Sequence, residues 1–229
     1  YLEAAEEFER IVNEDKRQTL NFADKALYNA GLAYQEIAYY DSAARIYERI
    51  ITEPRFKKSE FTEDVLFRLA ENHKLFFNFS QAIDTYLALA SRNPNNKNAP
   101  YSLFEAARLL ENDGRKKEAA TQYERYATVY PKREDAAALL FRAGDLWAKL
   151  GDEEKANQIF TSFIQRFEMV QSSAELVVFA RLKQADYLER KGKTRQAKEA
   201  YQQVIADFTA KGLEMGSAAA AYPAKAKFS

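Results

Sequence analysis

A small residue followed four positions later by an aromatic one recurs along the chain at regular intervals. The copies are Ala43/Tyr47, Ala82/Tyr86, Ala119/Tyr123, Ala156/Phe160 and Ala197/Tyr201, and the interval between successive alanines is nearly constant. A weaker copy, Ala4/Phe8, stands one further interval upstream. Residues four apart lie on one face of an α-helix. The pattern therefore predicts a series of helices, each buried along the face that carries these two residues.

A second set of positions lies at constant offsets from the repeated alanines. Thirteen positions before the alanines lie Ala30, Leu69, Ala106, Ala143 and Gln184. The next residue is always small, at Gly31, Ala70, Ala107, Gly144 and Ala185. Three positions later stand Tyr34, His73, Leu110, Trp147 and Leu188, which are mostly large. We expect two paired helices per repeat, with the small residues of the two helices facing each other and the aromatic side chains interlocking beside them.

Residues that end and begin helices fall where this pairing needs them. Glycine, which favours a left-handed C-cap, separates the two helices in three repeats, at Gly114, Gly151 and Gly192. Proline, which cannot continue a helix, follows the second helix at Pro54, Pro94 and Pro131. Asp152 is a predicted N-cap. Ser172 and Glu175 have the spacing of a capping box, with the serine at the N-cap.

Together these signals predict helices over residues 1–12, 22–38, 40–53, 60–77, 79–92, 98–112, 115–130, 134–150, 152–167, 172–191, 193–209 and 216–228. No linker interrupts them, so we expect one continuous domain. Its repeats would cover residues 22–58, 59–96, 97–133, 134–170 and 171–210, with half repeats at 1–21 and 211–229. A helix pair cannot bury its apolar face alone, so neighbouring pairs must stack into a solenoid.

The pattern of Gly or Ala, a large residue, Gly, Ala-x-x-x-Tyr and Pro resembles the tetratricopeptide repeat. Five consecutive copies between residues 24 and 209 carry the resemblance. It implies an all-α, right-handed superhelix that binds a protein or peptide in a concave groove lined by the first helices. The interval is longer than the roughly 34 residues of the family repeat, with the extra positions near 53–62 and 168–173. Lengthened repeats of this kind, with segments such as residues 126–131, are also similar to those of bacterial cell-envelope proteins of the BamD and CpoB kinds and of gliding-motility envelope subunits.

Composition narrows the functional classes. Lys plus Arg and Asp plus Glu each number 34, so net charge gives no reason to expect a nucleic acid partner. The chain has no cysteine and one histidine, which excludes thiolate sites and disfavours a catalytic centre or a metal site. The longest apolar run, Leu176–Phe179, is far shorter than the roughly 20 residues of a membrane span. The sequence begins at Tyr1 without an initiator methionine, so we expect a fragment, in which a signal peptide or lipid anchor would not be seen.

Candidate partner-binding residues occupy equivalent positions on the predicted first helices. Two positions before the Ala30-type residue, an aromatic row consists of Tyr28, Phe67, Phe104, Phe141 and Leu182. Charged candidates beside it are Arg68, Arg108, Arg142, Asp145 and Asp186. Exposed on a groove, the row would anchor a ligand that has apolar and acidic groups. Alternatively, the rings pack between repeats and the charges pair with one another, as Arg142 and Asp145 can at i,i+3.

Other conspicuous side chains have structural interpretations. His73 and Trp147 stand at positions where the repeat requires a large packing residue, so both are expected in the core. The aromatic residues Tyr39, Tyr40, Phe76, Phe77 and Phe79 fall at predicted turns, where they either fill the next interface or form an exposed apolar edge. The terminal helices could mediate self-association.

The sequence thus predicts a non-enzymatic scaffold that binds a protein or peptide. It requires no cofactor or metal and does not itself insert into a membrane. A periplasmic or outer-membrane-associated location is favoured over a cytoplasmic one. Two alternatives are a cytosolic adaptor or regulator and, more remotely, the helical appendage of an enzyme.

Overall fold

The computed structural model describes residues 1–210 of the 229-residue chain. Over this range the chain forms eleven α-helices and two short 3-10 turns, and no strand. The helices are α1 (Leu2–Glu14), α2 (Ala23–Glu36), α3 (Tyr40–Thr52), α4 (Thr62–Leu75), α5 (Phe79–Arg92), α6 (Ala99–Asn112), α7 (Lys116–Val129), α8 (Ala136–Lys149), α9 (Glu153–Phe167), α10 (Ala174–Arg190) and α11 (Thr194–Ala210). The ends of each agree to within two positions with a predicted helix, and the prediction for 216–228 lies outside the described residues.

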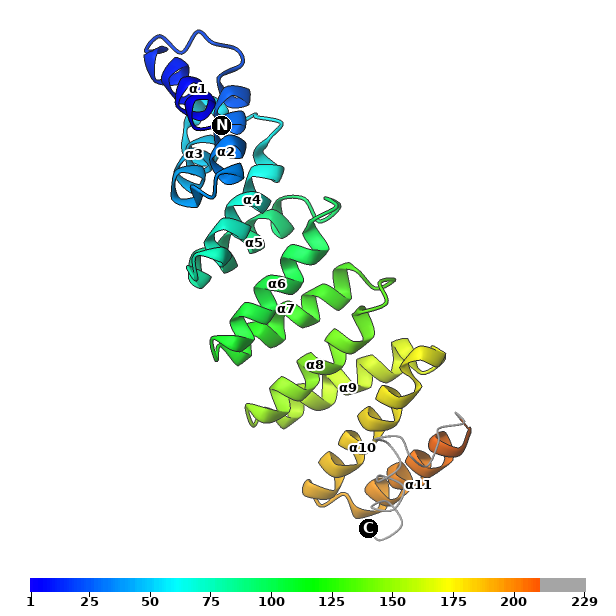
Figure 1. Cartoon of the computed structure of the whole chain (residues 1–229). Coiled ribbons are helices and arrows are strands. Elements are labelled where there is room, and N and C mark those ends of the chain that lie inside the picture. The colour runs from blue at the N-terminus through cyan, green and yellow to red at the C-terminus, as the bar shows by residue number, and fades with distance from the viewer. Residues whose placement is uncertain (211–229) are drawn as a thin grey trace. The chain divides into compact units, whose positions relative to one another are not determined.

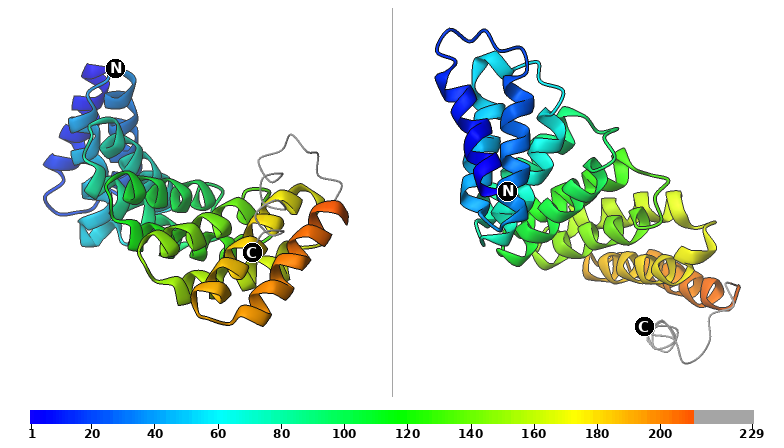
Figure 2. Two further views of the ribbon diagram at one scale, coloured as in Figure 1. Left: turned by 90° about the horizontal axis from the view of Figure 1, so that it is seen from below. Right: turned by 45° about the horizontal axis from the view of Figure 1, so that its top comes forward.

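The described part of the chain divides into two compact units, one over Tyr1–Leu109 and one that begins at Leu110. In the first unit α1 packs on α2, α2 on α3, α3 on α4 and α4 on α5. In the second, α7 packs on α8, α8 on α9, α9 on α10 and α10 on α11. Successive helices run antiparallel within each unit (Figures 1 and 2). This sequential pairing confirms the all-α solenoid arrangement predicted from the repeat.

The repeated small and aromatic residues form the core. Ala43, Ala82, Tyr47 and Tyr86 are completely buried in the first unit, and Ala119, Ala156, Phe160 and Tyr201 are buried in the second. The predicted packing roles of His73 and Trp147 are also confirmed, since both are at least nine-tenths buried. Truncating a large aromatic core side chain to alanine costs about 3–5 kcal/mol in comparable proteins.

In two repeats the small residue of the first helix lies against the aromatic ring of its own repeat. A Cβ built on Gly31 would meet three ring atoms of Tyr47, and one built on Gly144 would meet the ring of Phe160. The small residue of the first helix is therefore small because the aromatic ring of the same repeat occupies the adjacent space.

Two local predictions were wrong. The α10 helix begins at Ala174 after a 3-10 turn (Gln171–Ser173), and neither the serine at its N-cap nor a capping box supplies a side-chain cap. In α1 the buried alanine is Ala5, while Ala4 is exposed, so the upstream copy is shifted by one position. The apolar face of α1 follows Ala5, Phe8 and Val12, at the three- and four-residue steps that keep side chains on one side of a helix.

The glycine prediction is confirmed, and the structure extends it. Gly114, Gly151 and Gly192 have φ between 70° and 82°. The equivalent residues of the first two repeats are Ala38 and Phe77, both with φ of 60°. All five repeats thus use the same left-handed turn between their helices, but only three place glycine there. The extra residues between repeats form the 3-10 turns at Pro54–Phe56 and Gln171–Ser173.

Candidate interaction surface

The aromatic row lies on the first helices of the repeats and is partly covered by neighbouring residues. Tyr28, Phe67, Phe104 and Phe141 are half-buried and Leu182 is buried. Tyr28 on α2 stacks on Phe61, which precedes α4, with ring centroids 4.6 Å apart. Phe67 on α4 meets Tyr101 on α6 edge-on at 5.9 Å. These rings therefore connect one repeat to the next while part of each remains accessible.

In the second unit, Phe141 is the centre of an aromatic cluster. Its ring on α8 lies 5.4 Å from Phe160 and 5.8 Å from Phe163, both on α9, and 6.3 Å from Phe179 on α10. Contacts with three rings from two helices hold this ring in place. Its remaining exposed surface is what a ligand could contact.

The charged candidates of the first unit are paired with neighbouring carboxylates. Arg68 donates to Asp64 at 2.6 Å, and the same carboxylate accepts from the hydroxyl of Tyr28 at 2.6 Å. Burial opposes ionisation of Asp64, but these two hydrogen bonds, together with the positive charges of Arg68 and Lys97, outweigh it and lower its pKa. Arg108 forms a bidentate pair with Glu105 at 2.8 and 2.9 Å. A ligand carboxylate must compete with these internal partners.

The second unit shows the same arrangement. Arg142 forms an ion pair with Glu111 and a longer one with Asp145 at 3.4 Å. Asp145 is also 2.7 Å from Lys149. Asp186 accepts a hydrogen bond from the hydroxyl of Tyr201 at 2.7 Å.

Two of the arginines remain accessible despite their internal pairs. The side chains of Arg108 and Arg142 each keep 42% of their surface exposed. This exposed surface is what a partner could contact.

Sequence reasoning missed a row of polar residues five positions after the Ala30-type residue. Its members Gln35, Lys74 and Glu111 each contact the first helix of the next repeat, through Arg68 at 3.4 Å, Glu105 at 3.4 Å and Arg142 respectively. Two of them also bind the repeat aromatic residue, since Tyr47 and Tyr123 donate their hydroxyls to Gln35 and Glu111. The constant offset was the signal that could have revealed this row. Its role is to fix the spacing of consecutive first helices.

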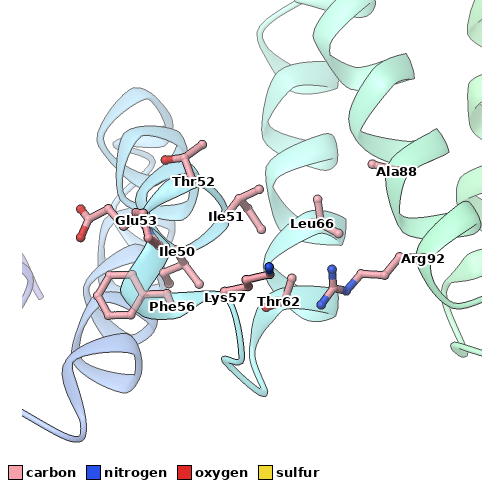
Figure 3. A pocket seen from close by; sticks show the side chains of 11 residues that line it. Ile50, Ile51, Thr52, Glu53, Phe56, Lys57, Thr62, Leu66, Ala88 and Arg92 are labelled. Atoms are coloured by element: carbon pink, nitrogen blue, oxygen red, sulfur yellow. The ribbon is translucent and has the colours of Figure 1, made fainter.

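A pocket of about 460 Å³ lies between α3, the 3-10 turn at Pro54–Phe56, α4 and α5. In Figure 3, Lys57 and Arg92 extend toward Thr62 from opposite sides, and Ile51 and Leu66 point toward one another. Within residues 1–210 neither Lys57 nor Arg92 has an ion-pair partner, whereas Glu53 is held by Arg49 and Arg55. Two cations beside an apolar wall suit an anionic group attached to an apolar one.

The described part of the chain shows neither a group of metal-ligating side chains nor a membrane-spanning helix. No group of three His, Asp or Glu side chains there is arranged to hold a metal ion. Among the same residues, none of the helices is both long and apolar enough to cross a bilayer.

Comparison with known proteins identifies the repeat. The family model described as tetratricopeptide repeat matches five times, at residues 25–54, 64–96, 101–133, 138–168 and 179–209. Similar solved structures include MamA (14% identity, 80% of this chain and 97% of that one, TM-score 0.46). YrrB, titled a TPR protein with an unusual peptide-binding site, shares 13% identity over 96% of this chain and 99% of its own, with a TM-score of 0.45. TTC0263 of Thermus thermophilus shares 19% sequence identity over 90% of this chain and 100% of its own, with a TM-score of 0.39. Among curated proteins, none matches the chain.

Proposed function

This chain belongs to the tetratricopeptide repeat family, and on that premise we propose that it is a non-enzymatic scaffold that binds a partner protein or peptide on the surface of its first helices. We call this surface the A-face of each unit. In the first unit it consists of Tyr28, Phe67, Arg68, Phe104 and Arg108, and in the second of Phe141, Arg142, Asp145 and Asp186. Proteins of the family bind peptides or proteins, and their fold is typically a non-catalytic scaffold.

One observation carries the proposal. Four successive repeats place a half-exposed aromatic ring at the same position, although a residue needed only for the core would be fully buried there, as Leu182 is in the fifth. Large aromatic side chains that combine a fixed position with exposed surface are the usual anchors of protein interfaces. The arginines beside them offer planar donors to a partner.

The A-face is preformed in each unit. Its charges are held by internal pairs such as Arg68–Asp64 and Arg142–Glu111, and its rings by contacts such as Tyr28–Phe61. A surface whose side chains are already ordered loses less conformational entropy on binding. This supports recognition by a rigid surface over folding around the ligand.

Site-specific photo-crosslinking tests the proposal. Benzoylphenylalanine replaces Arg108 on α6 in one variant and the exposed Lys117 on α7, a second helix, in the matched control. Both proteins are expressed in the source organism, irradiated, purified and analysed by mass spectrometry. We expect a partner adduct from position 108 and none from position 117. Adducts only from position 117, or from neither position, would argue against the A-face.

The cellular location belongs to the same proposal. We infer the cell envelope from the lengthened repeats, whose alanines recur at intervals above the roughly 34 residues usual for the family. Fractionation of the native host, with protease added to intact spheroplasts, tests this. Degradation of the protein in intact spheroplasts is expected, and protection until lysis would favour the cytosolic adaptor.

A further inference from the structure

The turns of the first two repeats carry an exposed apolar patch. We call it the aromatic edge and define it by Tyr39, Tyr40, Leu75, Phe76, Phe77 and Phe79. Phe77 is 79% exposed and Leu75 is 54% exposed. Tyr40 meets Phe76 edge-on at 5.7 Å and Phe77 meets Phe79 at 5.8 Å. The first of these contacts joins the α2–α3 turn to the α4–α5 turn, so the side chains of the two turns form one patch within the first unit.

Later repeats do not carry this patch at the same turns. The segments equivalent to Leu75–Phe79 are Asn112–Lys116, Lys149–Glu153 and Arg190–Thr194. Apart from Leu150, these segments contain charged, polar or small side chains. The repeat architecture therefore forms its turns without needing a cluster of large apolar residues.

The backbone conformation of Phe77 is also energetically unfavourable. Its φ of 60° lies in the left-handed region, which disfavours a residue with a Cβ by roughly 1–2 kcal/mol. Its turn makes the same hydrogen bonds as the glycine turn at Gly114, from residue 77 to Lys74 and from Asn78 to His73. Glycine would close this turn more easily. A strained and exposed phenylalanine points to a role outside folding.

A polar pocket of about 210 Å³ opens beside the aromatic edge. Tyr40 and Phe76 belong to both, and Asp41, Glu48 and Asn72 also line the pocket. In the described part of the chain neither Asp41 nor Glu48 takes part in an ion pair. The lining cation Arg45 is already bound to Glu9 at 2.5 Å. The pocket therefore has uncompensated negative charge, framed by two aromatic rings.

Asn72, which lines this pocket, has an amide nitrogen without a hydrogen-bond acceptor. It is 1% exposed, its Oδ1 accepts from Gln35 at 2.8 Å, and its Nδ2 has no acceptor. A buried amide without a partner costs about 1–3 kcal/mol. Because Nδ2 has almost no accessible surface, a peptide carbonyl reaches it only after the side chain turns toward the pocket.

We propose that the aromatic edge and this pocket form a second binding site, separate from the A-face, for a partner segment that carries a lysine or arginine flanked by apolar residues. The basic side chain enters between Asp41 and Glu48, where the rings of Tyr40 and Phe76 add cation–π attraction. The apolar neighbours cover Phe77, Phe79 and Leu75. Charge complementarity selects this occupant over an anionic membrane surface, which the carboxylates would repel.

A random dodecapeptide phage library, selected on the protein and counter-selected on Phe77→Gly, tests the site. We expect enrichment of peptides that have Lys or Arg between apolar residues. Failure to enrich any peptide, or enrichment of acidic peptides, would overturn the proposal. Phe77→Gly is chosen because glycine relieves the left-handed strain, so the variant is expected to stay folded.

Fluorescence anisotropy with the enriched peptide then assigns the residues. Asp41→Asn, Glu48→Gln and Phe77→Gly should each weaken binding at least tenfold, while Leu150→Ser, at the equivalent turn of the fourth repeat, should leave it unchanged. If Asp41→Asn, Glu48→Gln and Phe77→Gly all bind the peptide as tightly as the parent protein and the control do, the site is refuted.

Two further measurements test whether a membrane or a second copy of the chain, in place of a peptide, binds the aromatic edge. Sedimentation with phosphatidylserine vesicles tests a membrane surface, and a concentration series in the analytical ultracentrifuge tests a second copy of the chain. Neither vesicle binding nor dimerisation through this patch is expected. The proposal would be overturned if the phage library yields no peptide while the protein binds vesicles or dimerises, and Phe77→Gly abolishes that binding or dimerisation. The occupant would then be a membrane or a second copy of the chain.

Discussion

The ring of Tyr47 lies directly against the backbone of Gly31, so that a Cβ on this glycine would be less than 3.0 Å from three atoms of the ring. Tyr47 is fully buried and its hydroxyl bonds to Gln35 at 2.7 Å, so the ring cannot move away without losing contacts. Gly144 and Phe160 repeat this close approach in the second unit, whereas the repeats with Ala70, Ala107 and Ala185 accommodate a Cβ at the same position.

Gly31→Ala is therefore expected to lower the free energy of unfolding by about 1–2 kcal/mol, since overpacking outweighs the better helix propensity of alanine. Urea titration followed by circular dichroism measures the change. The matched control is Ala70→Gly, which removes a buried Cβ at the same position of the next repeat and should cost the helix propensity, about 1 kcal/mol, and the burial of one methyl group, about 1 kcal/mol. A more stable Gly31→Ala variant would show that the ring adjusts freely.

The left-handed turns predict opposite effects at equivalent positions. Ala38→Gly should raise the free energy of unfolding by about 0.5–1 kcal/mol because it relieves a φ of 60°. Gly114→Ala should lower it by a similar amount, although no atom lies within 4 Å of the new Cβ. Thermal melts of the two variants beside the parent protein measure both changes. Shifts of the same sign would contradict the backbone argument.

His73 predicts a pH dependence in the neutral range. Burial lowers its pKa below the ordinary value, against the opposing charge of Glu48. The unfolded chain then binds more protons than the folded one, so stability is complete above about pH 6.5 and declines as pH falls toward the lowered pKa. The chain has one histidine, and Leu110 and Leu188 fill the same position elsewhere. His73→Leu should thus flatten the stability profile between pH 5 and 7 in urea titrations. A profile unchanged by the substitution would rule out His73 as its source.

Glu105 predicts a second, more acidic transition. Glu105 is 5% exposed, and although burial opposes its ionisation, Arg108 and Lys74 lower its pKa. A carboxyl with a lowered folded pKa adds stability above its unfolded pKa, about 4.3, and loses it as pH falls through the folded value. Glu105→Gln should destabilise the protein by about 1–2 kcal/mol at pH 7 and much less at pH 3. Urea titrations at the two pH values measure this, with the exposed Glu118→Gln as the control. An equal loss at both pH values would indicate a packing defect.

The sequence by itself determined the helices and their pairing. Steps of three and four positions, repeated once per helix pair, place small and large side chains on defined helix faces, and local signals such as Gly151 and Asp152 set the helix ends. These features depend on residues near one another in the chain, which is why they could be predicted. The capping box at Ser172 failed because a 3-10 turn satisfied the same local requirement.

Only the tertiary structure decided which side chains share a surface and which remain exposed. The sequence offered Phe67 and Phe77 as similar aromatic candidates, but Phe67 packs against Tyr101 of the next repeat while Phe77 projects from a strained turn. It could not show that Arg142 is engaged by Glu111 of the preceding repeat, or that Asp41 and Glu48 border a pocket whose lining arginine is already paired with Glu9. Such facts depend on contacts between helices distant in sequence, and periodicity identifies the face of a helix without specifying what covers it.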